Sequence, residues 1–556
     1  MTLHSLNHRR AGAFAVAFIC VATVTASLVT GAGRKFYDDD PLMREVDTQD
    51  ASAAKPWDID LIWDLSLNLF ATPAQVTNSP RAGNINTVDE VPDSNWFTNR
   101  IGTHPVSVEA ITRGPLEGEG PAAGTLTITR PKLVGASPGF TMRDSRNQLW
   151  FVSFDARGFP EAATGAVLVA NKLMWALGYW QVENHLTSIR PDRLQIAETA
   201  VMTPPSGKRR PMRQSDLNEV LRRAHRSADG SYRAVAARAV PGTPIGGFRY
   251  HGTRPDDPND IVPHEDRREL RALKVFGAWI NLVDMKAGNT LDTLIEQDGR
   301  RVVRHYLQDV GSTFGVAAAG PHDYDEGWEH LYQGGATMAR LATFGFYIRP
   351  WQTVSYANVP AIGRFEGDVF DPMEWRPRVP NAALLRARAD DGFWAARRLA
   401  AFSDELIRAA AKTGQYSEPA SAEHLASVLI KRRDRIVRAY LPAINPLVDF
   451  KMDSGGTLTF ANAAVQANAA AAPKGYSAQW ARFDNLSGTA TAIGSPVAAA
   501  TASIAAPSGL PSESGAYIKV QIRATDAPHA AWTTPVDVYF RRSAAGWTLV
   551  GIERMP

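Results

Sequence analysis

The chain has 556 residues, of which 44% are hydrophobic, and this composition is typical of a globular protein with more than one domain. The net charge of +3 is small for this length and no long basic block interrupts the chain, so nothing indicates nucleic-acid binding. The single cysteine, Cys20, lies in the N-terminal apolar stretch. The rest of the chain therefore has no internal disulfide, thiolate nucleophile or cysteine-bound metal.

The first 33 residues have the pattern of an export signal. Residues 8–10 are basic, residues 11–33 carry no charge, and small residues near position 31 are suited to cleavage. The apolar run is also long enough to span a bilayer, which needs roughly 20 residues. We therefore expect export to the periplasm or cell envelope, by a cleaved signal peptide or by a signal anchor that keeps the protein on the membrane.

Residues 34–123 follow as a tether and N-terminal extension. Residues 34–56 are acidic and rich in alanine and aspartate, which is typical of a tether, and residues 57–63 have a short helical pattern. We interpret residues 92–100 as an ordered surface loop packed by Trp96 and Phe97.

Residues 124–202 change to a strand pattern. The first strand alternates over residues 125–129, and a glycine turn at 134–139 separates it from further strands at 140–143 and 149–154. A helix from about 160 to 177 follows and is closed by Gly178. Two more strand candidates, around 183–189 and 194–202, complete a five-stranded sheet.

Residues 203–446 begin with a loop-rich stretch to about 262. A strong helix is expected from about 264 to 282, and its charged start at 264–269 is interpreted as solvated and ion-paired rather than as a metal site. A strand, a turn at Asp298-Gly299 and a second strand to Leu307 come next, and residues 380–440 have an all-helical pattern.

The last segment, residues 447–556, is rich in small residues. Strand runs at 517–522, 536–540 and 547–552 predict a small antiparallel β domain.

Two short motifs carry the chemistry. Asp284-Met285-Lys286-Ala287-Gly288-Asn289 spells D-x-K-x-x-N, and Asp309-Val310-Gly311 spells D-x-G after the predicted hairpin. An aspartate that orients a hydroxyl, followed by an asparagine and an aspartate that hold magnesium, is the polar core of a kinase-type phosphotransfer site. The simpler interpretation is that Asp284 and Asn289 cap and turn a loop while Asp309 ends a strand.

The order of these elements resembles the protein-kinase-like superfamily, especially its atypical bacterial and secretory members, over residues 124–440. The resemblance implies an α+β, two-lobed protein-kinase-like fold. It has a five-stranded small lobe at 124–202 and a mainly helical large lobe at 203–446, followed by the C-terminal antiparallel β domain at 447–556.

The resemblance also implies the roles of the motif residues. Asp284 matches the catalytic aspartate and Lys286 the lysine that neutralises the transferred phosphoryl group. Asn289 and Asp309 match the ligands of a magnesium ion that accompanies ATP.

The sequence departs from the family at one ion pair. A lysine is expected on the third strand, where Phe151 and Ser153 stand, and its glutamate partner on the next helix is replaced by Val167. Loss of both partners is more consistent than loss of one, because a single unpaired buried charge is costly. Lys172, on the same helix, is interpreted as a solvated surface lysine.

Two explanations of the missing pair stay open. Another cation replaces the lysine, with Lys132 and Arg143 as candidates and with Gly135 and Gly139 as backbone donors to phosphate, or the pocket does not bind nucleotide in the usual way. The first explanation predicts an exported or envelope-anchored phosphotransferase that uses ATP and magnesium on an unknown protein or envelope acceptor.

The alternative is a catalytically inactive pseudokinase-like scaffold or binding protein of the cell envelope. Scarcity of nucleotide outside the cytoplasm favours the scaffold, whereas three convergent oxygen ligands favour the enzyme. A metal-dependent hydrolase that uses the same carboxylates is a third hypothesis.

Overall fold

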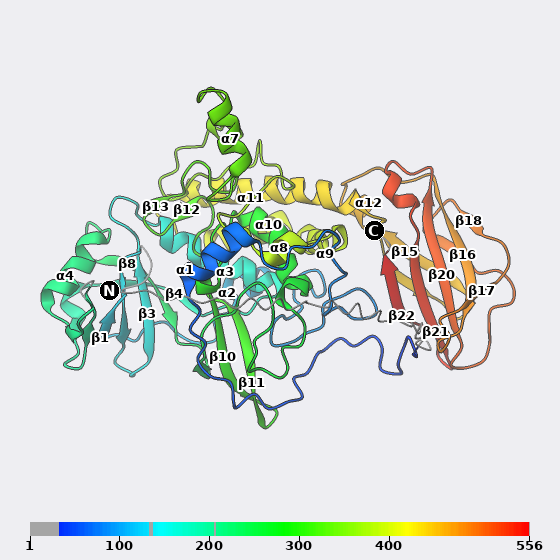
Figure 1. The fold of residues 1–556 in the computed structure, drawn as a ribbon, viewed down its shortest axis with the longest axis horizontal. Coiled ribbons are helices and arrows are strands. Elements are labelled where there is room, and N and C mark those ends of the chain that lie inside the picture. The colour runs from blue at the N-terminus through cyan, green and yellow to red at the C-terminus, as the bar shows by residue number, and fades with distance from the viewer. Residues whose placement is uncertain (1–32, 133–136, 205–206, 555–556) are drawn as a thin grey trace, which may run out of the picture.

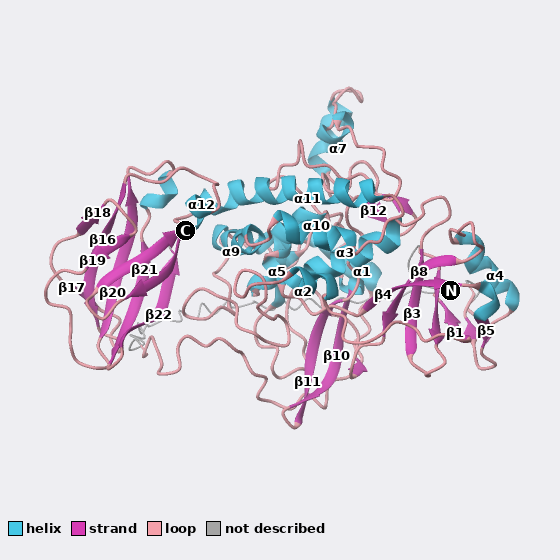
Figure 2. Cartoon of the chain, turned by 180° about the vertical axis from the view of Figure 1, so that it is seen from behind, coloured by secondary structure: helices cyan, strands magenta, loops and turns pink. Residues whose placement is uncertain are grey.

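The computed structural model describes residues 33–132, 137–204 and 207–554 and shows a mixed α/β protein with several sheets. A six-stranded sheet lies at one end, helices occupy the middle and a β domain lies at the other end (Figure 1). Figure 2 shows the helices gathered between the two strand-rich ends. Among the described residues, no helix combines the length and the apolar character that crossing a membrane requires.

The sheet at the N-terminal end has six strands, not the five expected from the sequence, in the order β4-β8-β3-β2-β1-β5. Its strands are β1 (Leu126–Pro131), β2 (Gly139–Arg143), β3 (Leu149–Phe154), β4 (Asn184–Ile189), β5 (Leu194–Ile196) and β8 (Tyr232–Arg238). The strand β8 comes from the stretch expected to be loop-rich and inserts between β3 and β4. Ala234 and Ala236 lie buried at its centre. Because alanine has low strand propensity, the sequence does not predict this strand, which forms through tertiary packing.

Helices cover both faces of this sheet. The helix α3 (Ala162–Leu177) is mostly buried against the helical body, whereas α4 (Gln214–Arg223) packs Leu217 and Val220 on the opposite face. As expected, α3 ends at Gly178, which has φ +119°. A Cβ there would lie 2.3 Å from the ring of Phe97, so the glycine lets the 92–100 loop pack its buried Phe97 against the helix end.

The helix expected from 264 to 282 is broken into three pieces. These are the 3₁₀ turn η3 (His264–Asp266), α5 (Arg268–Arg271) and α6 (Leu273–Ile280), with Arg267 in an extended conformation between the first two. The charged start is buried rather than solvated, which corrects the expectation from the sequence. Side chains of this segment reach carboxylates on several other segments, and a straight solvated helix would not place them all inward.

The remaining helices follow the expected all-helical stretch. They are α8 (Ala382–Arg386), α9 (Ala389–Ala400), α10 (Asp404–Lys412) and α11 (Pro419–Tyr440). Smaller elements are α1 (Leu61–Ser66), the π-helix η1 (Leu67–Ala71), α2 (Val108–Arg113), β6 (Val201–Met202), β7 (Arg210–Pro211), β12 (Val316–Ala317), β13 (Gly320–Pro321) and α7 (Gly334–Ala342). Figure 1 shows α11 running along the helical body toward the β domain.

The predicted hairpin is present as β10 (Thr290–Gln297) and β11 (Arg300–Leu307), with β9 (Thr243–Pro244) beside β10. Asp298 and Gly299 both have positive φ, 50° and 77°, which is the backbone of the tight hairpin turn expected for Asp-Gly. Because the two strands pair along their whole length, the residues just before β10 and just after β11 are brought together.

The C-terminal domain is antiparallel β, as expected. Its strands are β14 (Leu447–Met452), β15 (Thr457–Asn462), β16 (Gly475–Phe483), β17 (Ala490–Ala492), β18 (Val497–Ala499), β19 (Ser503–Ala505), β20 (Tyr517–Thr525), β21 (Val536–Ser543) and β22 (Gly546–Arg554), with the short helix α12 (Ala463–Gln466). They form a three-stranded sheet and a six-stranded sheet.

Residues 34–56, expected to be a tether, are packed on the body of the protein. Phe36 is buried among rings of the C-terminal domain, the Glu45 N–H donates to the Asp93 carbonyl, and the Ala51 N–H donates to the Arg301 carbonyl. The segment thus runs from the β domain to the hairpin, as the blue chain in Figure 1 shows.

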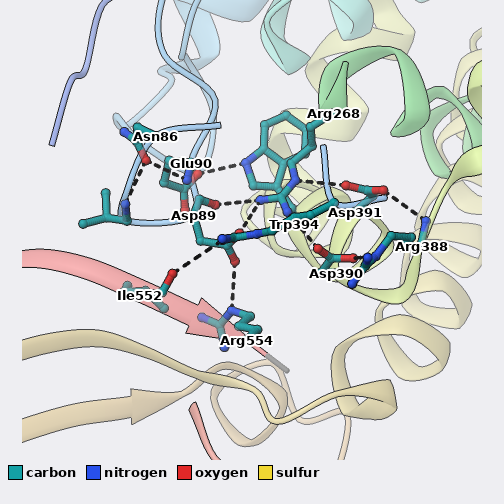
Figure 3. Close-up of polar contacts among 12 residues, drawn as sticks. Asn86, Asp89, Glu90, Arg268, Arg388, Asp390, Asp391, Trp394, Ile552 and Arg554 are labelled. Carbon is teal, nitrogen blue, oxygen red and sulfur yellow. Dashed lines mark hydrogen bonds and ion pairs between the residues drawn. The ribbon is translucent and has the colours of Figure 1, made fainter. Parts of the chain in front are cut away.

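A buried ion-pair network joins the distant segments of the helical body (Figure 3). Arg268 contacts Asp89 at 2.8 Å, Asp391 at 3.0 Å and Asp390 at 3.2 Å. Arg554 of β22 adds a 3.2 Å contact to Asp89 and donates to carbonyls at the start of the C-terminal domain. The network therefore ties the N-terminal extension, α5, α9 and the last strand into one structure.

Candidate active site

The loop with the D-x-K-x-x-N motif directly follows α6 and the left-handed residue Asn281 that ends it. The half-buried Asp284 accepts a hydrogen bond at Oδ2 from Lys286 Nζ, 2.8 Å away. The Asn289 side chain donates through Nδ2 to the Asp284 carbonyl at 2.7 Å. The loop is thus folded by its own motif residues, and the Asn289 amide oxygen is the atom left to act as a metal ligand.

The D-x-G motif lies beside this loop because the hairpin closes on it. The Asp309 N–H donates to the Asn289 carbonyl at 3.0 Å, and Asp309 Oδ1 accepts from the Gly311 N–H at 3.0 Å. Asp309 itself is exposed. A Cβ on Gly311 would lie 2.8 Å from Val167 Cγ2, so the glycine allows α3 to approach the motif closely.

Lys132 reaches the same place from the end of β1. Its Nζ donates to Ser137 Oγ at 2.8 Å and to Ser153 Oγ at 3.1 Å. Burial lowers the pKa of Lys132, and the carboxylate of Asp309 partly opposes that effect. The ammonium group therefore lies beside Ser153 on β3, where the sequence lacks the expected lysine.

A register shift in β1 helps to aim Lys132. Opposite β2, the pairing slips between Ile128 and Arg130, so one residue of β1 is unpaired. Such a bulge reverses which face the following side chains occupy. The Lys132 N–H then donates to the Gly139 carbonyl at 3.0 Å and extends the pairing of β1 with β2.

The two candidate glycines and Arg143 are placed differently. A Cβ on Gly139 would lie 2.2 Å from the Val152 carbonyl oxygen, so only glycine fits there, whereas Gly135 lies outside the described residues. Arg143 is at the opposite end of β2, where it is exposed, pairs with Thr127 and donates to the Asn147 carbonyl at 2.8 Å. The structure therefore does not bring Arg143 to the motif loops, because the antiparallel pairing of β1 and β2 separates the two ends.

The described residues contain no group of three or more His, Cys, Asp or Glu side chains arranged to hold a metal. The candidate pair is one amide, Asn289, and one carboxylate, Asp309. This donor set suits Mg²⁺, which takes few protein ligands and completes its shell with waters and substrate phosphates. It does not suit a structural zinc site, which needs four protein ligands.

A buried histidine that the sequence did not point to lies next to these loops. His322 Nε2 is 3.0 Å from the Oγ of Ser312, the residue after D-x-G, and 3.5 Å from a Glu326 carboxylate oxygen. Burial and the nearby Arg378 lower the pKa of His322 to about 3, so the imidazole is neutral. No spacing in the sequence links these residues, because the turn through β12 and β13 brings them together.

Lys172 of α3 is buried, whereas the sequence predicts a solvated surface lysine. Its Nζ donates to the Arg113 carbonyl at 2.6 Å. Burial lowers the pKa of Lys172 to about 8. Its environment is α2 rather than the motif loops, so it supports the fold.

No protein-family model and no curated protein matches this chain. Among solved structures, a crystal structure of the Golgi casein kinase matches with a TM-score of 0.31 and 9% identity, over 71% of this chain and 94% of that chain. The Golgi casein kinase with Mn/ADP bound matches with a TM-score of 0.29 and 10% identity, over 71% and 95%. Kinase structures are thus weak structural neighbours, and scores this low carry no argument about function.

Proposed function

We propose that this protein is an exported or envelope-anchored kinase-like phosphotransferase that uses ATP and magnesium on a hydroxyl of an unknown acceptor. The observation that carries the proposal is the position of Lys132. Its ammonium group donates a hydrogen bond to Ser153, and the charge of Asp309 acts on its pKa. The backbone N–H of Asp309 in turn donates to the Asn289 carbonyl. A cation for phosphate and two oxygen ligands for a metal thus come from three separate segments.

Each motif residue has a role that its contacts allow. Asp284 orients the acceptor hydroxyl and takes its proton, and Lys286, 2.8 Å from Asp284, neutralises charge on the transferred phosphoryl group. Asn289 and Asp309 would hold magnesium, which when bound neutralises charge on the nucleotide phosphates.

A scaffold without catalysis is the second candidate, and a specific observation favours it. Val167 faces Gly311 from α3, where kinases place a glutamate. In the described part of the chain, Lys132 has no carboxylate within ion-pair distance, and its ammonium group donates to two serine hydroxyls instead. A lysine that lacks this partner is less firmly placed for chemistry, although it can still bind an anion.

Thermal unfolding of purified residues 34–556 with and without Mg²⁺ and ATP separates these functions. If the protein is a phosphotransferase, Mg-ATP should raise the midpoint temperature of unfolding of the wild-type protein. The protein should also transfer phosphate from ATP to a protein or envelope acceptor. Asp309→Ala should abolish the shift because it removes the only carboxylate of the candidate metal pair. Asp192→Ala, which changes an exposed aspartate in the turn between β4 and β5, is the matched control and should keep the shift.

The other outcomes are equally specific. No shift of the wild-type protein with any nucleotide or divalent cation supports the scaffold, and a shift with metal alone supports a metal-dependent hydrolase. The absence of any shift in the wild-type protein contradicts nucleotide binding at this site.

A further inference from the structure

Two segments of the chain expose many large apolar side chains. One consists of α1 and η1, and the other of residues 331–348 around α7. The exposed side chains are Leu61, Ile62, Trp63, Phe70, Leu331, Tyr332, Met338, Leu341, Phe344, Phe346, Tyr347 and Ile348. Contiguous apolar surface of this extent on a soluble domain marks an interaction site.

The second segment projects from the helical body (Figure 1). None of the residues of α7, all of which the structure describes, is buried. Phe344 and Phe346, just after the helix, are 93% and 87% exposed.

The two segments form one surface, which we call the apolar wedge (α1, η1 and residues 331–348). The rings of Phe70 and Tyr332 lie 5.8 Å apart and join the segments. Leu61 packs on the motif loop, where its Cδ1 is 3.1 Å from the position of a Cβ on Gly288. The wedge therefore borders the candidate active site.

The charge of the wedge tip is one-sided. Residues 330–350 contain Arg340 and Arg349 and no aspartate or glutamate. Arg349 is paired with Glu329, whereas the exposed Arg340 has no ion-pair partner among the described residues. The tip thus presents apolar side chains with a free positive charge beside them.

We propose that the apolar wedge binds the surface of a lipid bilayer that contains anionic lipids. A convex tip with two almost fully exposed phenylalanines needs a partner that deforms around it, and a bilayer interface does so without a preformed groove. Binding of this kind depends on buried apolar area plus attraction of basic residues to anionic headgroups, which Phe344, Phe346 and Arg340 supply. The inference concerns the surface alone and does not depend on phosphotransfer.

Vesicle binding of residues 34–556 tests this inference without the N-terminal apolar segment. The only cysteine of the chain is Cys20, so a single cysteine introduced as Phe346→Cys can carry an environment-sensitive fluorophore. We expect its fluorescence to rise several-fold with phosphatidylcholine vesicles that contain phosphatidylglycerol. The same label at Leu486→Cys, an exposed leucine of the β domain, should not respond.

Unlabelled variants give the affinity. Phe344→Ser with Phe346→Ser should weaken co-sedimentation with these vesicles by about a hundredfold, because two large apolar side chains no longer enter the bilayer. Arg340→Gln should weaken binding to anionic vesicles and leave binding to pure phosphatidylcholine unchanged. Val369→Ser with Leu486→Ser, two exposed apolar residues outside the wedge, should bind as the wild type does.

Each contrary result overturns the inference. If the label at position 346 does not respond, or if the double serine variant sediments as the wild type does, the wedge does not enter lipid. A stable dimer that the double variant dissociates, without vesicle binding, would assign the wedge to a second copy of the chain. Circular dichroism of each variant confirms folding, and the tip side chains are too exposed for their loss to unfold the protein.

Discussion

The ion-pair network around Arg268 and the candidate active site are both clusters of charged side chains from distant segments, but they differ in how many partners each charge has. Arg268 is fully buried and contacts three carboxylates (Figure 3). Lys132 is bonded to two serine hydroxyls, and the exposed Asp309 has no ion-pair partner among the described residues. Charged side chains whose ion-pair partners are all within the protein stabilise a fold, whereas charged side chains without such partners can bind a ligand.

The pKa shifts follow the same division. The carboxylates around Arg268 raise the pKa of its guanidinium despite burial, and Arg268, Arg554 and Arg81 hold the pKa of Asp89 well below its usual range. Burial lowers the pKa of Lys132 because one carboxylate, Asp309, does not offset the desolvation. The fold thus compensates the buried charge of Arg268 with carboxylates, whereas the charge of Lys132 is only partly compensated and would be stabilised by a bound anion.

Loss of the central cation of the network is expected to have the largest effect on stability. Arg268→Met should lower the free energy of unfolding by about 3–5 kcal/mol, because it leaves buried carboxylates without their cation. Urea denaturation measures the change, and Arg222→Met, at an exposed ion pair of α4, should cost less than about 1 kcal/mol. Equal losses for the two variants would show that Arg268 is no more important to the fold than a surface arginine.

Lys172 sharpens the comparison because it is buried and, among the residues that the structure describes, has no carboxylate within ion-pair distance. Its folded pKa is about 8, while an unfolded lysine keeps its proton to about 10.4, so the unfolded state binds more protons between these values. The free energy of unfolding of the wild type, relative to Lys172→Met, should therefore rise by about 1.4 kcal/mol per pH unit in this window.

Urea denaturation between about pH 7 and about pH 10 measures this slope. Lys474→Met, at an exposed lysine of the C-terminal domain, should follow the wild type throughout. Parallel curves for wild type and Lys172→Met would mean that Lys172 titrates as an exposed lysine does.

Local signals made parts of the fold predictable. The hairpin follows from two short apolar runs on either side of Asp298-Gly299, and its closure places Asp309 against Asn289. The antiparallel strands of the C-terminal domain follow from similar strand runs separated by turns.

Other parts depend on tertiary context that no local pattern carries. The strand β8 is alanine-rich, and the helix expected at 264–282 breaks because its charged residues are drawn to partners on distant segments. The placement of Lys132 depends on a one-residue register shift in β1, and that of His322 on a turn. Sequence spacing therefore identified the motif residues but could not choose between Lys132 and Arg143 as the phosphate-binding cation. The pairing of β1 with β2 places only Lys132 near the motif loops.

The most direct test of the central claim is calorimetric titration of residues 34–556 with Mg-ADP, comparing wild type, Lys132→Met and Lys474→Met. If the Lys132 ammonium binds the nucleotide phosphates, Lys132→Met should weaken binding by about ten- to a hundredfold, the value of a charged hydrogen bond, while Lys474→Met leaves binding unchanged. Equal affinity of wild type and Lys132→Met, or no binding by the wild type, would contradict the assignment of this site.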